Sequence, residues 1–228
     1  MANNQEATGD TVSEQKVFEF KGETVDVTWD GRLCIHVGEC TRAEGALFEA
    51  GRKPWCKPDE TTVDAIANVV ERCPTGALTI TRRDDGKTEA APAQNTVAVS
   101  NQGPLYVSGD LEIEGAPDDA PSLAYRAALC RCGESKDKPF CDNSHEDADF
   151  TDRGAVGQTG DPLEATGGKL VIKSAENGPL LLQGNVTVVA GSGREAWQGT
   201  KAALCRCGAS TNKPFCDGKH KTVGFEAD

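Results

Sequence analysis

An internal duplication constrains the fold of this chain more than any other feature. Residues 75 positions apart match without a gap: Gly103-Pro104-Leu105 returns as Gly178-Pro179-Leu180, and Ala127-Ala128-Leu129 returns as Ala202-Ala203-Leu204. The same offset relates Gly109 to Gly184, Cys130 to Cys205, Cys132 to Cys207, Cys141 to Cys216, His145 to His220 and Phe150 to Phe225. A fixed period of this kind indicates a repeated structural unit. We therefore expect two modules, at residues 96–153 and 154–228.

Each copy begins with segments that favour strands. In the first copy these are 96–99 and 105–113, and in the second they are 170–173 and 180–189. Val, Ile, Leu and Tyr between Gly, Asn and Pro are typical of hairpins. A variable loop and the Ala-Ala-Leu sequence then lead into a cysteine-rich loop. We therefore expect each copy to be a β-rich module.

The residues ahead of the duplication form a separate unit at 16–81. Its predicted elements are strands at 17–20 and 25–29, a helix carrying Val63, Ile66, Val69 and Val70, and a closing strand at 78–81. Thr61, three residues before Asp64, is a weak start signal for this helix, and Cys73-Pro74 ends it. Residues 82–95 are polar and have the composition of a linker. Residues 1–15 are expected to be a disordered tail.

Composition favours several small, metal-stapled units over one large core. Hydrophobic residues make up only 37% of the chain and aromatic residues 5%, whereas ten cysteines can supply ligands. The N-terminal sequence has no signal or transit character and no apolar run could span a membrane, so we expect a cytoplasmic protein. In that reducing compartment clustered cysteines hold metal more often than they form disulfides. The formal charge of −12 argues against nucleic acid as a partner and suits a basic protein partner.

The duplicated loop places three thiolates and one imidazole within sixteen residues, twice. Its pattern is Cys-x-Cys, eight residues, Cys, three residues, His, formed by Cys130, Cys132, Cys141 and His145 and again by Cys205, Cys207, Cys216 and His220. These ligands suit iron–sulfur clusters or zinc. Structural zinc sites usually separate paired cysteines by at least two residues, so Cys-x-Cys favours an iron–sulfur cluster and leaves zinc as the alternative. Disulfides rank third, because each copy would keep an odd thiol.

Both loops resemble the CDGSH iron–sulfur domain, the NEET-type fold, over roughly residues 96–228. The family pattern is Cys-x-Cys, two residues, Ser or Thr, three residues, Pro, one residue, then Cys-Asp-Gly-x-His. The further matching residues, which the resemblance assigns to the cofactor site, are Ser135, Pro139, Asp142, Ser210, Pro214 and Asp217. The resemblance also implies one [2Fe-2S] cluster in each copy, with the Cys-x-Cys pair on one iron and the Cys and His on the other. It implies further that the two loops face each other about a pseudo-twofold axis within the chain.

Two residues depart from this family pattern, and the histidine ligands carry a mechanistic consequence. Asn143 replaces the usual Gly and tolerates the positive φ that the turn needs. Lys219 replaces a small residue, so we expect a cation near the second cluster and a small difference in potential between the sites.

An imidazole in place of a thiolate raises the potential of a cluster. Because protons compete with iron for that imidazole, we expect both clusters to become labile below neutral pH.

The N-terminal unit carries cysteines in a second arrangement. Cys34, Cys40 and the remote Cys73, which precedes a proline, are spaced as in ferredoxins. Three cysteine ligands suit a [3Fe-4S] cluster, or a [4Fe-4S] cluster whose fourth ligand is His36 or Cys56. A module that has lost its cluster is the third possibility.

Residues from about 18 to 78 resemble the divergent single-cluster 4Fe-4S ferredoxin family. The resemblance rests on Cys-x-His-x-Gly-x-Cys, on Arg52-Lys53-Pro54-Trp55 and on Cys-Pro-x-Gly-Ala-Leu. In this family the position of Cys56 is usually aliphatic, which favours a buried core residue over a ligand. His36 fits the family pattern better, although a loop histidine can equally serve as a hydrogen-bonding residue.

These features predict an α+β protein, with a small ferredoxin-like α+β domain followed by two β-rich CDGSH-type modules. The predicted function is one-electron transfer between the N-terminal cluster and the paired clusters, or with a redox protein partner. Cluster storage, cluster transfer or redox sensing is one alternative, and a zinc-stapled interaction module is another. We do not expect an enzyme, because the sequence contains no evident open ligand position or general base.

Overall fold

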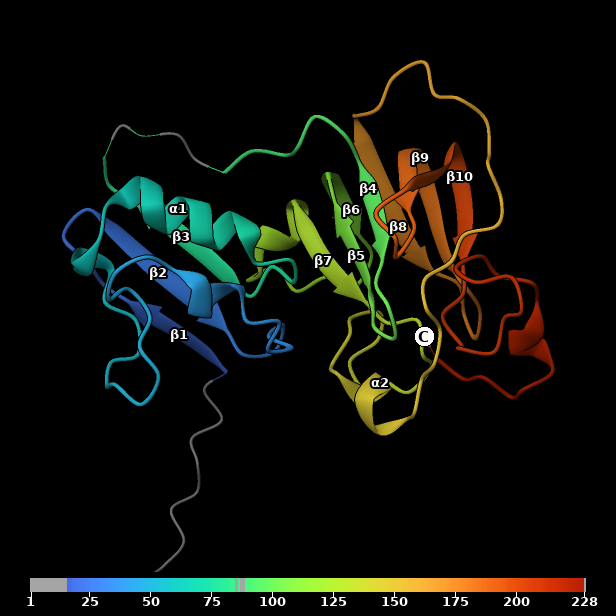
Figure 1. Ribbon diagram of the computed structural model, residues 1–228, viewed down its shortest axis with the longest axis horizontal. Helices are drawn as coiled ribbons and strands as arrows, with labels where there is room; N and C mark the ends of the chain where they lie inside the picture. The colour runs from blue at the N-terminus through green and yellow to red at the C-terminus, as the bar shows by residue number, and fades with distance from the viewer. Residues whose placement is uncertain (1–15, 85, 87–88, 228) are drawn as a thin grey trace, which may run out of the picture.

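The chain folds into two adjoining parts. The computed structural model describes residues 16–227 except 85, 87 and 88, so the tail expected at 1–15 lies outside the described residues. A three-stranded sheet lies on one side of the molecule and a larger, seven-stranded sheet lies on the other (Figure 1). Within the described residues, no helix is long and apolar enough to cross a membrane.

The N-terminal unit is an antiparallel sheet covered by one helix. Its strands are β1 (Val17–Phe20), β2 (Val25–Asp30) and β3 (Leu78–Arg82), with β2 in the centre. The helix is α1 (Val63–Arg72), and its buried Ile66 and Val70 share one core with Val27 and Leu78 of the sheet. Two short 3-10 helices, η1 (Glu39–Arg42) and η2 (Pro58–Glu60), lie between β2 and α1.

The N-cap of α1 is Thr62, one residue beyond the start signal that the sequence suggested at Thr61. The Thr62 side-chain oxygen accepts a hydrogen bond from the N–H of Ala65 at 3.3 Å. This bond satisfies one of the backbone donors left unpaired in the first turn of a helix. The other end agrees with the sequence, because the helix stops at its C-cap Cys73, directly before Pro74.

The duplicated half forms one seven-stranded mixed sheet to which both copies contribute strands. The first copy contributes β4 (Thr96–Val99), β5 (Leu105–Ser108), β6 (Asp110–Ile113) and β7 (Arg126–Leu129), and the second contributes β8 (Lys169–Ser174), β9 (Leu180–Val189) and β10 (Glu195–Leu204). The order is β6-β8-β9-β4-β5-β7, and β10 also pairs with β9. Three short helices complete this half: η3 (Pro121–Ala124), α2 (Ser144–Asp147) and η4 (Lys219–Lys221).

The two copies exchange strands reciprocally. Strand β4 of the first copy pairs in parallel with β9 of the second, and β6 pairs in parallel with β8. Thr96 lies opposite Thr187 in one pairing, and Val171 lies opposite Glu112 in the other. Thr96 and Val171 are 75 residues apart, and so are Glu112 and Thr187, so the two pairings are equivalent with the roles of the copies exchanged. The copies are therefore related by a pseudo-twofold axis, and each completes its sheet with strands of the other.

The fold class agrees with the sequence prediction in part: the N-terminal sheet with its helix and the two β-rich copies are confirmed. As a whole the chain is mostly β rather than evenly α+β, since its α-helices within the described residues are α1, of ten residues, and α2, of four. The parallel pairs explain why so little helix is needed. A parallel connection within one module requires a crossover, usually a helix. Here the parallel partners come from different copies, so the strand exchange supplies the pairing without one.

A continuous hydrophobic core joins the N-terminal unit to the first copy. Leu33 and Ala77 of the N-terminal unit belong to the same buried cluster as the strands of the large sheet. Arg126 of β7 is also buried there, and its guanidinium donates to the carbonyls of Cys73 at 2.7 Å and Leu78 at 2.9 Å. Because a buried cation without partners is costly, these bonds fix the two parts in one arrangement.

Candidate metal centres

Each cysteine-rich loop begins where a strand ends and then folds back on that strand. In the first copy, the N–H of Cys130 donates to the carbonyl of Pro139 at 2.9 Å, and the N–H of Cys141 donates to the carbonyl of Ala128 at 2.9 Å. The second copy repeats both bonds 75 residues later, at 2.7 and 2.8 Å. This pairing returns the third cysteine of each motif to the side of the first two.

The eight ligands predicted in these loops form four close pairs, two in each copy. The distances are 3.7 Å from Cys130 Sγ to Cys132 Sγ, 3.4 Å from Cys141 Sγ to His145 Nδ1, 3.8 Å from Cys205 Sγ to Cys207 Sγ, and 3.4 Å from Cys216 Sγ to His220 Nδ1. The equal spacings in the two copies follow from the equal backbone pairing of the two loops.

These spacings fit two ligands on one tetrahedral metal. With metal–sulfur bonds of about 2.3 Å and metal–nitrogen bonds of about 2.0 Å, two sulfurs lie about 3.8 Å apart and a sulfur and nitrogen about 3.5 Å apart. No three of the described His, Cys, Asp and Glu side chains converge closely enough to hold a single metal ion. Separate pairs suit a binuclear iron cluster, in which each iron takes two protein ligands. A structural zinc ion instead needs four ligands around one centre.

The serine, proline and aspartate residues assigned to the cofactor site act on the loop backbone. Ser135 Oγ donates to the carbonyl of Phe140 at 2.7 Å, and Asp142 accepts two backbone N–H bonds at 2.8 and 3.0 Å. Pro139 supplies the carbonyl that anchors Cys130. Ser210, Asp217 and Pro214 make matching bonds in the second copy. These residues therefore hold the ligands in position through the backbone.

The two departures from the family pattern have different structural consequences. Asn143 has a φ of 73° and Gly218, its counterpart, has a φ of 87°, so the turn is preserved as the sequence predicts. Asn143 Nδ2 also donates to the carbonyl of Ile35 in the N-terminal unit at 3.1 Å. Lys219 is exposed at the start of η4, directly before His220.

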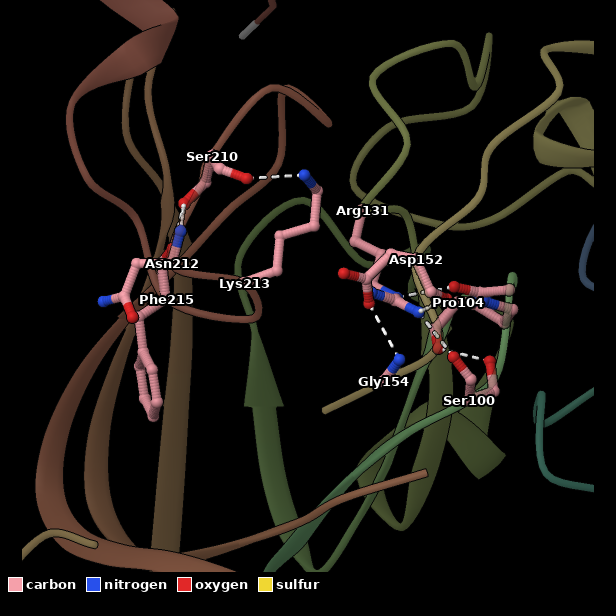
Figure 2. A network of polar contacts seen from close by, with 10 residues as sticks. Ser100, Pro104, Arg131, Asp152, Gly154, Ser210, Asn212, Lys213 and Phe215 are labelled. Atoms are coloured by element: carbon pink, nitrogen blue, oxygen red, sulfur yellow. Dashed lines mark hydrogen bonds and ion pairs between the residues drawn. The ribbon is translucent and has the colours of Figure 1, made fainter. Parts of the chain in front are cut away.

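Two buried arginines were missed by the sequence analysis. Arg131 and Arg206 are the middle residues of the two Cys-x-Cys motifs, and each is only 1% exposed. Arg131 Nε donates to the carbonyl of Gly103 at 2.7 Å, and its guanidinium also binds the carboxylate of Asp152 (Figure 2). Arg206 Nε donates to the carbonyl of Gly178 at 3.0 Å. The internal duplication could have drawn attention to them, because the two arginines are 75 residues apart, as the cysteines of the two motifs are.

The two loops meet closely at the pseudo-twofold axis. Gly133 and Gly208 directly follow the Cys-x-Cys motifs, with φ values of 96° and 74°. A Cβ on Gly133 would lie 2.8 Å from the carbonyl oxygen of Cys207, and one on Gly208 would lie 2.1 Å from that of Cys132. Glycine therefore allows both the backbone conformation and the close approach.

Lysines tie each loop to the opposite copy. Lys213 Nζ donates to the carbonyl of Ser210 at 2.6 Å, as Figure 2 shows, and lies 6.0 Å from the centre of the Phe150 ring in the first copy. Its counterpart Lys138 lies 5.7 Å from the ring of Phe225 in the second copy. Each contact is a cation–π interaction across the axis.

Burial shifts the pKa of three candidate ligands in the two loops. It raises the pKa of Cys141 and of Cys205 to about 11 and lowers the pKa of His145. Cys130 and Cys132 differ, since the hydrogen bond between them lowers the pKa of Cys130 and raises the pKa of Cys132. A neutral imidazole and a thiolate are the forms that bind metal. His145 and Cys130 are therefore shifted toward their ligand forms.

Three cysteines of the N-terminal unit surround one cavity of about 660 Å³. Cys34 and Cys40 come from the loop after β2, and Cys73 comes from the end of α1. Burial, together with the charges of Cys34 and Cys73, raises the pKa of Cys40, as expected for three neighbouring thiols. His36 also lines the cavity, and Trp29 contributes to its apolar wall. The cavity thus fits a cluster held by these three cysteines.

The structure places Cys56 away from this cavity. Cys56 is 1% exposed and packs in the N-terminal core with Leu47 and Ile66. Burial raises the pKa of its thiol to about 12, which opposes the thiolate form that a metal needs. Of the two candidates for a fourth ligand, only His36 is among the residues that line the cavity.

Comparison with known families agrees with this arrangement of sites. Residues 20–83 match the family described as "Divergent 4Fe-4S mono-cluster". Residues 102–146 and 177–221 match the family described as "Iron-binding zinc finger CDGSH type". The chain belongs to the iron–sulfur cluster-binding proteins. It joins one mono-cluster domain to two CDGSH domains, which agrees with the resemblances found in the sequence.

Two curated relatives cover part of the chain. Both are described as "Uncharacterized protein YjdI", one from Escherichia coli strain K12 and one from Escherichia coli O157:H7. Each is 44% identical over 59 residues, which are 26% of this chain and 78% of the relative. No solved structure matches the chain.

Proposed function

We propose that this protein is a one-electron carrier with two [2Fe-2S] clusters and one [3Fe-4S] or [4Fe-4S] cluster. The observation that supports the proposal is the arrangement of ligands, with two close pairs in each CDGSH loop and three thiols around one neighbouring cavity. Clusters with such ligands accept and donate single electrons.

The proposed ligand assignment follows these groupings. Cys130 and Cys132 would hold one iron of the first cluster, and Cys141 and His145 the other. The second cluster would use Cys205 and Cys207 on one iron and Cys216 and His220 on the other. Cys34, Cys40 and Cys73 would hold the N-terminal cluster, with His36 as the candidate for a fourth ligand.

The protein's own contribution is a set of loops fixed by hydrogen bonds, with the cysteines of the first CDGSH site buried. The loops are tied to their strands by backbone hydrogen bonds, and the buried Arg131 and Arg206 anchor them to neighbouring turns. Fixed ligands and low solvent access are the means by which a protein tunes a cluster's potential. Neither feature provides a substrate site, so we propose a carrier without an enzymatic reaction of its own.

An anaerobic redox titration followed by electron paramagnetic resonance tests this function. We expect reversible one-electron reduction of each centre. Replacing His145 by Cys should lower the potential of the first CDGSH centre by on the order of 100 mV, because a thiolate adds negative charge. The matched control is Cys56→Ala, which should leave cluster content and potentials unchanged. Loss of the clusters upon the first reduction would contradict the carrier function.

Cluster transfer is the second candidate, and one observation favours it. Cys207 and Cys216 of the second centre are half-buried, whereas the matching Cys132 and Cys141 are buried. A more accessible cluster is easier to hand to an acceptor. Incubation with an apo-ferredoxin separates the two functions: rapid transfer of iron and sulfide favours a donor, and retention favours a carrier.

We further propose a redox protein as the partner. The formal charge of −12 suits a partner with a basic surface, since complementary charge accelerates encounter. Such an encounter should slow as ionic strength rises. A zinc-stapled interaction module, the contrasting hypothesis, would require zinc in place of iron and sulfide.

A further inference from the structure

The N-terminal centre and the first CDGSH centre are joined by direct contact between their loops. Ile35 directly follows Cys34 in the N-terminal loop and is 6% exposed. It lies in a small buried cluster with Cys141 and Ala128, against which Tyr106 packs. A residue adjacent to a proposed ligand of one centre thus packs on a proposed ligand of the other.

A hydrogen bond reinforces this contact. Asn143 Nδ2 donates to the carbonyl of Ile35 at 3.1 Å. Asn143 is two residues beyond Cys141, so one hydrogen bond connects the backbone segments that carry Cys34 and Cys141. Bonded and tightly packed atoms transmit electrons better than empty space does, because they leave no gap across which the electronic coupling decays.

The second copy is placed differently. Gly218 stands where the first copy has Asn143, and so has no side chain that could donate such a bond. The second loop instead meets the first, where Gly208 lies against the carbonyl of Cys132. Figure 1 shows the order in space: the N-terminal unit, then the loop containing α2, then the loop at the C-terminal end.

We propose that Asn143 and Ile35 form the junction through which the N-terminal centre exchanges electrons with the first CDGSH centre, and that the second CDGSH centre exchanges electrons through the first. This inference rests on the proposed carrier function. One electron leaves the reduced N-terminal cluster, which is oxidised, and reduces the oxidised first [2Fe-2S] cluster. The same electron can then pass to the second. An external one-electron donor of low potential supplies it, and no bond forms or breaks. Asn143 acts as a positioning residue and holds no metal.

The test compares Asn143→Gly with the matched control Gly218→Asn. Asn143→Gly keeps the left-handed turn and removes only the side chain that donates to Ile35. Gly218→Asn places the same side chain in the second copy, where a Cβ meets no atom within 4 Å. In anaerobic protein loaded with clusters, a flash-photoreduced flavin delivers one electron, and absorption and freeze-quench magnetic resonance follow its passage between centres.

We expect Asn143→Gly to slow transfer from the N-terminal centre to the first CDGSH centre by roughly five-fold, the effect of losing one hydrogen bond on the closely packed population. The magnetic interaction between these two reduced centres should weaken, while iron, sulfide and the visible spectrum stay constant. Gly218→Asn should match the unsubstituted protein in rate and magnetic interaction. Equal rates in all three proteins, or equal slowing in both variants, would overturn the junction.

A second variant tests the order of the centres. Cys141→Ser removes a ligand of the first CDGSH centre, and we expect the second centre then to receive no electron from the N-terminal one. Undiminished reduction of the second centre in this variant would overturn the order but leave the carrier function intact. An N-terminal unit that takes up no cluster after reconstitution would also overturn the junction. Failure of the carrier function itself differs, because all centres of the unsubstituted protein would then resist reversible reduction.

Discussion

The two CDGSH sites have the same motif, yet the chain surrounds them differently. Cys132 and Cys141 of the first site are 9% and 3% exposed, whereas the matching Cys207 and Cys216 are half-buried. The N-terminal unit accounts for part of this difference, since Ile35 packs against Cys141. The motif therefore determines the candidate ligands, whereas the neighbouring parts of the fold determine how exposed each site is and which other parts of the chain it contacts.

The largest expected effect is the loss of one whole cluster from either copy. Cys141→Ser and Cys216→Ser should each remove about two irons and two sulfides per chain, because each substitution deletes one thiolate ligand of a binuclear cluster. Iron and sulfide analysis of the purified variants measures the loss. If both clusters vanish in either variant, the two sites assemble as one unit and cannot be compared as independent centres.

The next effect concerns the acid lability of the two clusters. A protonated imidazole cannot bind iron, so both clusters should become labile as the pH falls below neutrality. Burial lowers the pKa of His145, so its imidazole stays neutral to lower pH. We therefore expect the more exposed second cluster to be lost first. Visible absorbance during stepwise acidification of Cys141→Ser and Cys216→Ser, each carrying one CDGSH cluster, distinguishes the sites. A first cluster that bleaches at the higher pH would contradict the role given to burial.

The buried arginines provide a smaller comparison between the copies. Arg131 is paired with the carboxylate of Asp152, whereas the matching position in the second copy is Ala227, whose backbone carbonyl accepts from Arg206 at 3.2 Å. Arg131→Ala should cost about 3 kcal/mol in the free energy of unfolding, because it breaks a buried ion pair and leaves Asp152 without this cation. Denaturant unfolding of the loaded protein measures this cost. Arg131→Lys, which keeps the charge, should recover part of the loss. An unchanged free energy of unfolding in Arg131→Ala would contradict the anchoring role of this arginine.

The smallest expected effect tests the symmetry of the two loops. Lys138→Met and Lys213→Met should each cost about 1 kcal/mol, since each removes one cation–π contact and one hydrogen bond to a serine carbonyl. Denaturant midpoints of the two variants should therefore agree closely. A large difference between them would show that the axis relates the backbones but does not make the two contacts equivalent.

The sequence predicted the local elements well where one residue pattern dominates. The spacing of Val63, Ile66, Val69 and Val70 predicted α1, and the alternating strands of the N-terminal unit agree with β1 and β2. Two local details differed. The helix cap is Thr62, and Gly109 divides the segment 105–113 into β5 and β6. Strands β7 and β10 were not predicted, because the sequence suggested only a variable loop and a lead into the cysteine-rich loop there, and irregular pairing with β9 interrupts the alternation of β10.

Long-range features could not be read from the sequence. The exchange of strands depends on which copy supplies each parallel neighbour, and a repeat alone does not specify that choice. The contact between Asn143 and Ile35 likewise joins positions 108 residues apart, through packing of the two parts of the chain. The candidate ligands of the two CDGSH sites were predictable for the opposite reason, since each set lies within sixteen consecutive residues. For the N-terminal site, the sequence left both His36 and Cys56 as candidates for the fourth ligand. In the structure His36 lines the cavity and Cys56 does not.

The measurement that tests the three-cluster account most directly is iron, acid-labile sulfide and zinc per chain in anaerobically purified protein, with its visible spectrum. Three filled sites should give about seven or eight irons, four of them in the CDGSH sites and the others in the N-terminal cavity, with about eight sulfides in either case. About four irons would mean that the two CDGSH sites hold clusters and that the N-terminal cavity holds none. About two zinc ions, with no sulfide and no colour, would contradict the account and indicate a zinc-stapled fold instead.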